Sequence, residues 1–226
     1  MNILLVVATS GELAPIAAKF GAASVRDAAL VRYTYAGHMI DALVTGVGMV
    51  ATASHCSRAL TRDAYDLALN VGVCGSFDPS LEPGTVVHVV CDRLAELGAQ
   101  DDERFLTIQE MGLLGEDEPP FVKGGLVNTK PPANGALARL PAVRGITVNT
   151  VHGNDRSIAV VVERFRPQVE SMEGAAFMYA CLMHGVPFAQ VRAVSNRVER
   201  RNRHAWKMAE AITRAGEAAL SIIEHA

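Results

Sequence analysis

Two glutamates stand where an α/β protein places reactive groups. Glu12 follows an apolar run at residues 2–8, and Glu173 precedes an apolar run at residues 175–183. The first run has the composition of a buried strand and the second that of a helix, so both carboxylates are expected at strand–helix boundaries, where α/β enzymes bind ligands. Two carboxylates in one site can supply a general base and stabilise positive charge, as in the cleavage of glycosidic bonds.

Each glutamate also has a purely structural interpretation. An acidic side chain in the first turn of a helix is favourable for the helix dipole, and both Glu12 and Glu173 have that position. A neighbouring carboxylate, Glu170, has a weaker case for chemistry and is expected to be structural. Position alone therefore leaves the chemical and the structural interpretations of these acids open.

The segment at residues 169–196 organises the chain. It begins with Val-Glu-Ser-Met-Glu, continues into the expected helix at 175–183, and is interrupted by Gly185 and Pro187. A short apolar strand at 188–194 follows and ends in Ser195-Asn196. This pattern predicts one crossover unit of an α/β fold with polar groups at both strand ends.

These motifs resemble those of the nucleoside phosphorylase and nucleosidase family. The resemblance rests on Met172-Glu173, on Arg192 with Ser195-Asn196, on the glycine-rich stretch 72–76 and on the start of the chain, so it covers most of the sequence. It implies that Met172 packs under a ribose and that Glu173 accepts hydrogen bonds from the ribose hydroxyls. It also implies that Glu12 activates an attacking water.

The purine is expected at the stretch 72–76 and at the end of the 188–194 strand. Glycines at 72 and 75 let the backbone approach a flat ring, so the predicted contacts are Val73, Cys74, Gly75 and Ser195. Asn196 stands where members that cleave adenine nucleosides carry aspartate. An amide offers both a donor and an acceptor, which suits a 6-oxopurine, and Asn196 is assigned a catalytic role at the leaving base.

The attacking group is expected to be water and not phosphate. Phosphorylases of the family carry an arginine at the position of Asn70 and another in the early loop at residues 9–13, and both are absent here. A phosphate dianion without guanidinium partners is poorly held. The leading interpretation is therefore hydrolysis of a 6-oxopurine nucleoside. The alternatives are a 6-oxopurine nucleoside phosphorylase, a general purine nucleosidase and a nucleoside-binding protein without catalysis.

Several arginines could bind a carboxylate at the far end of such a substrate. Arg156 and the cluster at residues 197–203 are the candidates, with Arg197 the first of that cluster. The ordinary alternative is a solvated basic loop. Trp206 could stack on an aromatic ring, although a single tryptophan on an amphipathic helix is more often part of the core.

Bulk properties exclude other classes of function. The chain has 226 residues, half of them apolar, and a formal charge of −3, which gives no electrostatic case for nucleic acid or a membrane surface. Four separated cysteines, the absence of a metal-binding spacing and the lack of a signal peptide predict a cytoplasmic protein with reduced thiols, no metal and no cofactor. The family resemblance implies a homo-oligomer.

The alternation of apolar runs predicts one domain over residues 1–226, a three-layer α/β sandwich with a mixed central sheet. The expected strands are 2–8, 66–71, 85–91, 126–129, 146–151 and 188–194, with a hairpin formed by 31–35 and 39–45. The expected helices are 13–20, 50–60, 158–165, 175–183 and 202–224. Residues 93–125 are predicted to be a surface excursion carrying a short helical piece, and 131–145 to include another short helix.

Overall fold

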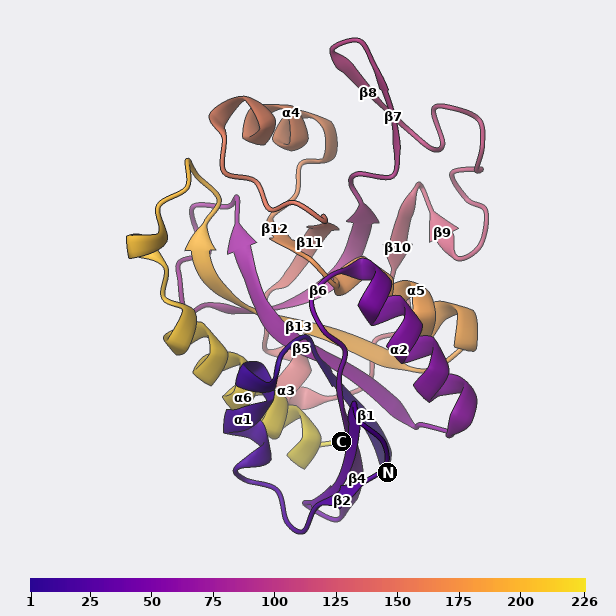
Figure 1. The fold of residues 1–226 in the computed structure, drawn as a ribbon, viewed down its shortest axis with the longest axis vertical. Coiled ribbons are helices and arrows are strands. Elements are labelled where there is room, and N and C mark those ends of the chain that lie inside the picture. The colour runs from indigo at the N-terminus through magenta and orange to yellow at the C-terminus, as the bar shows by residue number, and fades with distance from the viewer.

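The computed structural model describes all residues from 1 to 226 as one mixed sheet covered by helices on two faces (Figure 1). The first half supplies the strands β1 (Asn2–Val7), β2 (Ser24–Val25), β3 (Leu30–Tyr35), β4 (His38–Val44), β5 (Leu67–Ser76) and β6 (Val86–Leu94). The second half supplies β7 (Gly98–Asp101), β8 (Arg104–Thr107), β9 (Phe121–Val122), β10 (Gly125–Val127), β11 (Ala142–Thr147), β12 (Val169–Ser171) and β13 (Phe188–Arg197).

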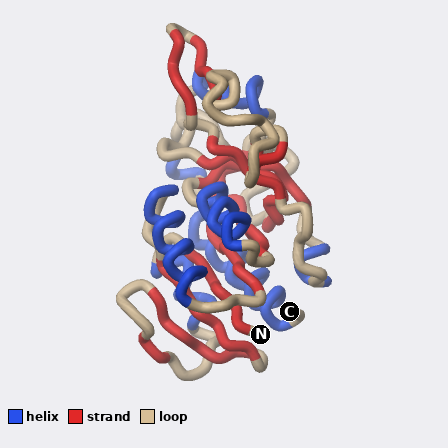
Figure 2. The backbone as a smooth tube through the Cα atoms, turned by 90° about the vertical axis from the view of Figure 1, so that its right-hand side faces the viewer, coloured by secondary structure: helices blue, strands red, loops and turns tan.

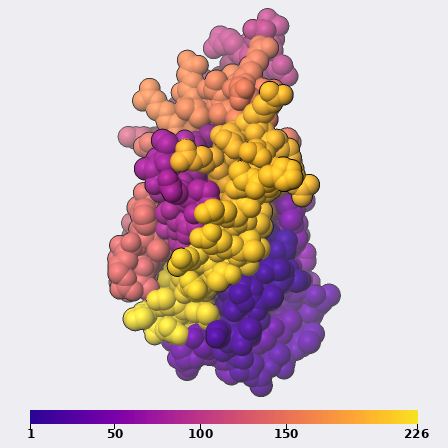
Figure 3. All heavy atoms as spheres, turned by 90° about the vertical axis from the view of Figure 1, so that its left-hand side faces the viewer, coloured from indigo at the N-terminus to yellow at the C-terminus, as the bar shows by residue number.

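The helices between these strands are α1 (Ser10–Ala17), α2 (Met49–Arg62), α3 (Gly135–Ala138), α4 (Asp155–Phe165), α5 (Gly174–His184) and α6 (Met208–Glu224), with a short 3₁₀ turn at Arg203–Ala205. Helices α1, α3 and α6 pack together, and α6 lies along α1 in Figure 3. Helices α2 and α5 pack against each other on the opposite face. The predicted three-layer α/β architecture is therefore confirmed. No helix is long and apolar enough to cross a membrane.

The alternation of side chains along β1 divides the core in two. Ile3, Leu5 and Val7 pack into the cluster that includes α6, whereas Leu4 and Val6 pack into the cluster that includes α5. Successive residues of a strand point to opposite faces of the sheet. An uninterrupted apolar run is thus required at β1, which the sequence provides.

Strand β5 lies at the centre of the sheet. It pairs in parallel with β1 through Asn70 and then, at Gly75 and Ser76, in antiparallel fashion with β12. Strand β13 pairs with β5 along its whole length, from Ala68 to Ser76. Strands β1 and β12 therefore follow each other along one side of β5, with β13 on the other side, although these strands are far apart in the sequence.

Several expected boundaries were wrong. The stretch 72–76 is not a turn, because β5 continues to Ser76 with β12 and β13 as partners. The segment 93–125 contains no helix and instead forms the β7–β8 hairpin, which projects at one end of the molecule in Figure 2. The strand expected at 146–151 lies at Ala142–Thr147 and pairs with β6 and β12.

Two helix starts also differ from expectation. Helix α4 begins three residues early because the side chain of Asn154 accepts hydrogen bonds from the backbone of Arg156 and Ser157. The helix expected at 202–224 begins only at Met208, because residues 203–205 form the 3₁₀ turn and the amide of Lys207 donates to the carbonyl of Ser195. That bond ties the start of α6 to the end of β13.

Candidate functional site

A cavity of about 370 Å³ lies at the carboxyl ends of the central strands. Its volume suits a small organic ligand. The wall brings together eight residues that the sequence singled out, namely Glu12, Val73, Cys74, Gly75, Met172, Glu173, Ser195 and Asn196. These residues come from α1, β5, the β12–α5 junction and β13, so the sheet topology assembles them. No lysine or arginine lines the cavity, whereas Glu12, Glu170 and Glu173 all do.

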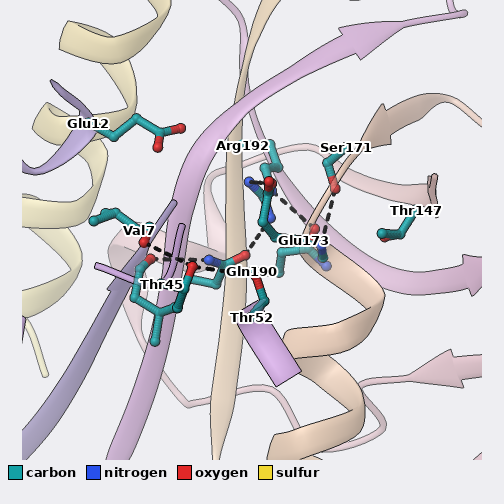
Figure 4. Close-up of polar contacts among 12 residues, drawn as sticks. Val7, Glu12, Thr45, Thr52, Thr147, Ser171, Glu173, Gln190 and Arg192 are labelled. Atoms are coloured by element: carbon teal, nitrogen blue, oxygen red, sulfur yellow. Dashed lines mark hydrogen bonds and ion pairs between the residues drawn. The ribbon is translucent and has the colours of Figure 1, made fainter. Parts of the chain in front are cut away.

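Glu173 is held in place from two sides at the start of α5. Its Oε1 accepts a hydrogen bond of 3.1 Å from the amide of Gly48, and its Oε2 lies 3.5 Å from Nη1 of Arg192. The residue is buried, with 6% of its surface exposed. Figure 4 shows the carboxylate pointing towards Arg192. A buried carboxylate fixed in this way can accept hydrogen bonds from a ligand without having to reorganise first.

Arg192 is fully buried and belongs to a polar network that the sequence did not reveal. Its Nη2 donates to Oδ1 of Asn70, and its Nε donates to Oε1 of Gln190 at 3.2 Å. The amide of Gln190 in turn donates to Asp92 at 3.1 Å. Asn70, which takes the place of a phosphate-binding arginine in the family comparison, thus serves here as an acceptor that orients Arg192.

Asp92 ends this network in the core. Its other oxygen accepts from the hydroxyl of Thr147 at 3.0 Å. Burial raises the pKa of Asp92 to about 6, and its hydrogen bonds with Gln190 and Thr147 oppose that rise. The polar residues Asp92 and Gln190 inside otherwise apolar strands were the sequence signal for this network.

Glu12 has a structural contact and a free oxygen. Oε2 accepts from the amide of Thr9 at 2.9 Å and from its hydroxyl at 3.0 Å, while the Thr9 hydroxyl accepts from the Glu12 amide. This reciprocal arrangement is a capping box at the start of α1. Oε1 takes no protein partner and lies 2.9 Å from the point where a Cβ on Gly72 would be.

Gly72 separates Glu12 from Arg192. A Cβ there would meet Nη1 of Arg192 at 2.5 Å as well as the Glu12 oxygen. Only glycine leaves room for both groups at this point of β5. The free oxygen of Glu12 and the partner of Glu173 therefore approach the same backbone position, which places both carboxylates around one part of the cavity.

Ser195 and Asn196 form a polar edge at the end of β13. The hydroxyl of Ser195 lies 3.1 Å from the carbonyl of Cys74 and 2.8 Å from Oδ1 of Asn196. Nδ2 of Asn196 donates to the carbonyl of Arg197 at 2.8 Å. An amide has two donor hydrogens and two acceptor lone pairs, so Asn196 keeps one of each for a ligand.

Cys74 is suited to packing and not to nucleophilic attack. Burial raises the pKa of its thiol to about 12, so the reactive thiolate is not formed near neutral pH. The residue lies within β5, with Val73 and Gly75 beside it on the cavity wall. Its place on the wall is compatible with the predicted contact to a purine, which stays a prediction.

The predicted arginines do not line the cavity. Arg156 is largely exposed and pairs with Glu103 at 3.0 Å, and Arg197 is half-exposed and lies 3.8 Å from Glu82. Their role in binding a substrate carboxylate stays a prediction. Among the cluster at 197–203, Arg201 packs its guanidinium over Trp206, which is itself part of the cavity wall and not of the core.

A histidine and a glutamate at the cavity were not predicted from the sequence to take part in the chemistry. His152 and Glu170 both line it, and their side chains are 2.6 Å apart. His152 lies in the loop between β11 and α4, and Glu170, expected to be structural, lies on β12. No three His, Cys, Asp or Glu side chains are arranged so that they could hold a metal ion.

Comparison with known proteins places these features in context. A sequence model described as the Phosphorylase superfamily matches residues 2–226. The futalosine hydrolase of Streptomyces coelicolor is 32% identical over 183 residues, which cover 76% of this chain and 73% of that protein. The futalosine hydrolase of Acidothermus cellulolyticus is 33% identical over 220 residues, covering 93% and 86%. The structure of futalosine hydrolase from Helicobacter pylori superposes with a TM-score of 0.83 over 100% of this chain and 98% of that one, at 15% identity.

Proposed function

Because the chain belongs to the phosphorylase superfamily, we propose that it is a nucleosidase that hydrolyses the N-glycosidic bond of futalosine, a 6-oxopurine nucleoside with a benzoate at its 5′ side. The products are hypoxanthine and dehypoxanthine futalosine, and the reaction belongs to menaquinone biosynthesis. The observation that carries this proposal is the single cavity in which Glu12, Met172-Glu173 and Ser195-Asn196 meet.

Each of these residues has a role in the proposed reaction. As the bond to the base breaks, the ribose develops oxocarbenium character. Glu173 accepts hydrogen bonds from the ribose hydroxyls, and these contacts strengthen as positive charge builds up on the sugar. Met172 forms the apolar surface under the ring. Oε1 of Glu12, free of protein partners, takes the proton of the attacking water.

Asn196 stabilises the leaving base. Its remaining donor faces O6 of a 6-oxopurine, and its remaining acceptor faces N7 when that atom is protonated. Val73, Cys74 and Gly75 supply the flat surface against which the base lies, and Ser195 orients the amide. In this arrangement Asn196 stabilises the electrons that the leaving base carries away, while Glu173 stabilises the positive charge on the ribose.

The charge of the cavity favours water over phosphate. Phosphorolysis would bring a dianion against three glutamates with no lysine or arginine on the wall. Arg192, the one arginine close to Glu173, is already engaged by Asn70, Gln190 and Glu173. A nucleoside phosphorylase is therefore the less supported alternative.

Incubation of the protein with futalosine and with inosine, each with and without phosphate, tests the function. We expect hypoxanthine and a free sugar from futalosine in phosphate-free buffer. Formation of a sugar 1-phosphate, or a strict need for phosphate, would assign the protein to the phosphorylases instead. Equal rates on inosine and futalosine would favour a general 6-oxopurine nucleosidase and remove the need for a carboxylate-binding arginine.

The partner of the benzoate is proposed to be Arg156 or a member of the cluster that begins at Arg197. Since neither residue lines the cavity, contact requires the 5′ arm of the substrate to extend beyond the cavity wall. Individual replacement by Met should lower the rate on futalosine and leave the rate on inosine nearly unchanged. A variant series without such a difference would exclude these arginines.

We also propose that the protein is a homo-oligomer in the reducing cytoplasm, where its four free thiols would persist. Helices α2 and α5 pack side by side and leave Val50, Tyr179 and Met183 exposed. Large apolar side chains exposed on neighbouring helices are candidates for an interface. Val50→Glu with Met183→Glu should reduce the mass measured by sedimentation, whereas Val160→Glu on α4 should not. A monomeric wild-type protein would refute the proposal.

A further inference from the structure

A histidine–glutamate pair occupies the cavity without a role in the reaction described above. Nδ1 of His152 lies 2.6 Å from Oε2 of Glu170, and the amide of His152 donates to Oε1 of the same carboxylate at 3.1 Å. The Glu170 side chain is 3% exposed and the His152 side chain 14%. The ring of His152 also lies edge-on to Phe77, with centroids 6.1 Å apart. The imidazole is therefore fixed in orientation by three contacts.

The carboxylate also fixes the tautomer of the ring. An ionised carboxylate can only accept hydrogen bonds, so the proton of the neutral imidazole resides on Nδ1. Nε2 then carries a lone pair, and no protein group donates to it. His152 thus presents a hydrogen-bond acceptor at the cavity wall.

The pair lies at the same level of the sheet as Asn196. Gly75 of β5 is paired with Glu170 of β12 on one side and with Asn196 of β13 on the other. A Cβ on Gly75 would lie 3.5 Å from Cγ of Glu170 and 3.5 Å from Nδ2 of Asn196. Asn196 and the carboxylate that holds His152 therefore flank the same residue of the cavity wall.

We propose that His152 reads the N1 position of the purine and that Glu170 positions it by setting its tautomer. The proposal rests on the proposed function, in which Asn196 contacts the N7 and O6 edge of the base. N1 is the next ring atom beyond the 6-position. In a 6-oxopurine N1 carries a hydrogen, which can be donated to the lone pair on Nε2 of His152.

This contact discriminates between two classes of nucleoside. In a 6-aminopurine N1 is unprotonated and has a lone pair, which would face the lone pair of Nε2. A site that accepts a hydrogen bond from the correct base leaves polar groups unpaired with the wrong one. His152 would therefore select 6-oxopurines independently of Asn196, and it would be a specificity-determining residue.

Two variants test the proposal by opposite changes. His152→Phe keeps the ring but removes the acceptor, so the ratio of kcat/KM for futalosine to that for its 6-amino analogue should fall by about tenfold to a hundredfold. Glu170→Gln replaces the acceptor of the Nδ1 hydrogen by an amide that can donate to Nδ1. The imidazole proton then moves to Nε2, and the preference should shift towards the 6-amino analogue.

His152→Gln is the matched control, because its side-chain carbonyl restores an acceptor. It should regain part of the preference that His152→Phe loses. If all three variants fold and keep the wild-type ratio, or lower both rates by the same factor, the pair is structural and the proposal fails.

Binding of the free bases separates this proposal from the proposed function. Affinities of the wild type and the variants for hypoxanthine and adenine, measured by calorimetry, do not depend on turnover. Preferential binding of hypoxanthine that is lost in His152→Phe would support the assignment even for a protein that does not cleave futalosine. Cleavage of futalosine with an unchanged preference in the variant would support the function and overturn the role of His152.

Discussion

Replacement of Arg192 by Met should both destabilise the protein and disable the site. The guanidinium is fully buried and donates to Asn70, Gln190 and Glu173. Met fills much of the same volume but leaves all three acceptors without their donor. Removal of one partner from a buried charged pair costs about 3–5 kcal/mol, mainly because the other charge is left uncompensated.

This cost can be converted into a thermal shift. For a chain of this size each kcal/mol corresponds to a change in Tm of roughly 2–4 °C. The variant should therefore melt about 6–20 °C below the wild type. Since Glu173 loses its partner, kcat/KM should also fall, by at least about tenfold for a loss of one charge-assisted hydrogen bond.

The matched control is Arg214→Met on α6. Arg214 is 57% exposed and lies 3.8 Å from Glu217, one turn away on the same helix. Exposed pairs contribute about 0–1 kcal/mol, so this variant should melt within a few degrees of the wild type. Differential scanning calorimetry measures the Tm of both variants, and steady-state kinetics measures their kcat/KM. If Arg192→Met melts with the control and retains wild-type kcat/KM, the network does not hold Glu173.

Three further outcomes are expected. Glu12→Gln should lower kcat by about two to four decades at nearly unchanged Tm, because glutamine can still complete the capping box with Thr9; wild-type turnover would remove Glu12 from the mechanism. Asn196→Asp should move the preference from futalosine towards its 6-amino analogue, because the O6 atom of futalosine would lose its donor at a cost of roughly 1–3 kcal/mol. If the ratio of the rates on these two substrates does not change, Asn196 does not contact the edge of the base. The pH dependence of Tm should contain two opposing contributions. Burial raises the pKa of Asp92 from 3.8 to about 6, so this group lowers stability as pH rises through that window, because the folded state holds the extra proton. Burial lowers the pKa of His88 from 6.5 to about 4, so it raises stability with pH over a similar window. Asp92→Asn should therefore steepen the rise of Tm between pH 4.5 and 6.5, and His88→Phe should flatten or reverse it; two profiles parallel to the wild type would contradict both assignments.

Local sequence patterns determined the architecture and identified the residues that we propose as the reacting groups. The run at β1 is almost entirely buried, as are the first five residues of α5, so composition alone identified both. The positions of Glu12 and Glu173 near helix starts and of Asn196 near the end of a strand were also predictable, since such boundaries depend on neighbours in the sequence. The end of β5 was misread because glycines at 72 and 75 are typical of turns, whereas here pairing with β12 and β13 keeps the chain extended.

Tertiary structure alone decided which groups support the reacting residues. Asp92, Gln190 and Arg192 come from β6 and β13. Glu170 meets His152 because β12 pairs in parallel with β11, the strand that precedes His152. Tertiary structure also placed Arg156 against Glu103 and away from the cavity wall. Strand order brings together residues as far apart in the sequence as Asn70 and Arg192, which are separated by 122 positions. No local pattern encodes that order, because hydrogen bonds between strands are made by backbone groups that nearly every residue carries.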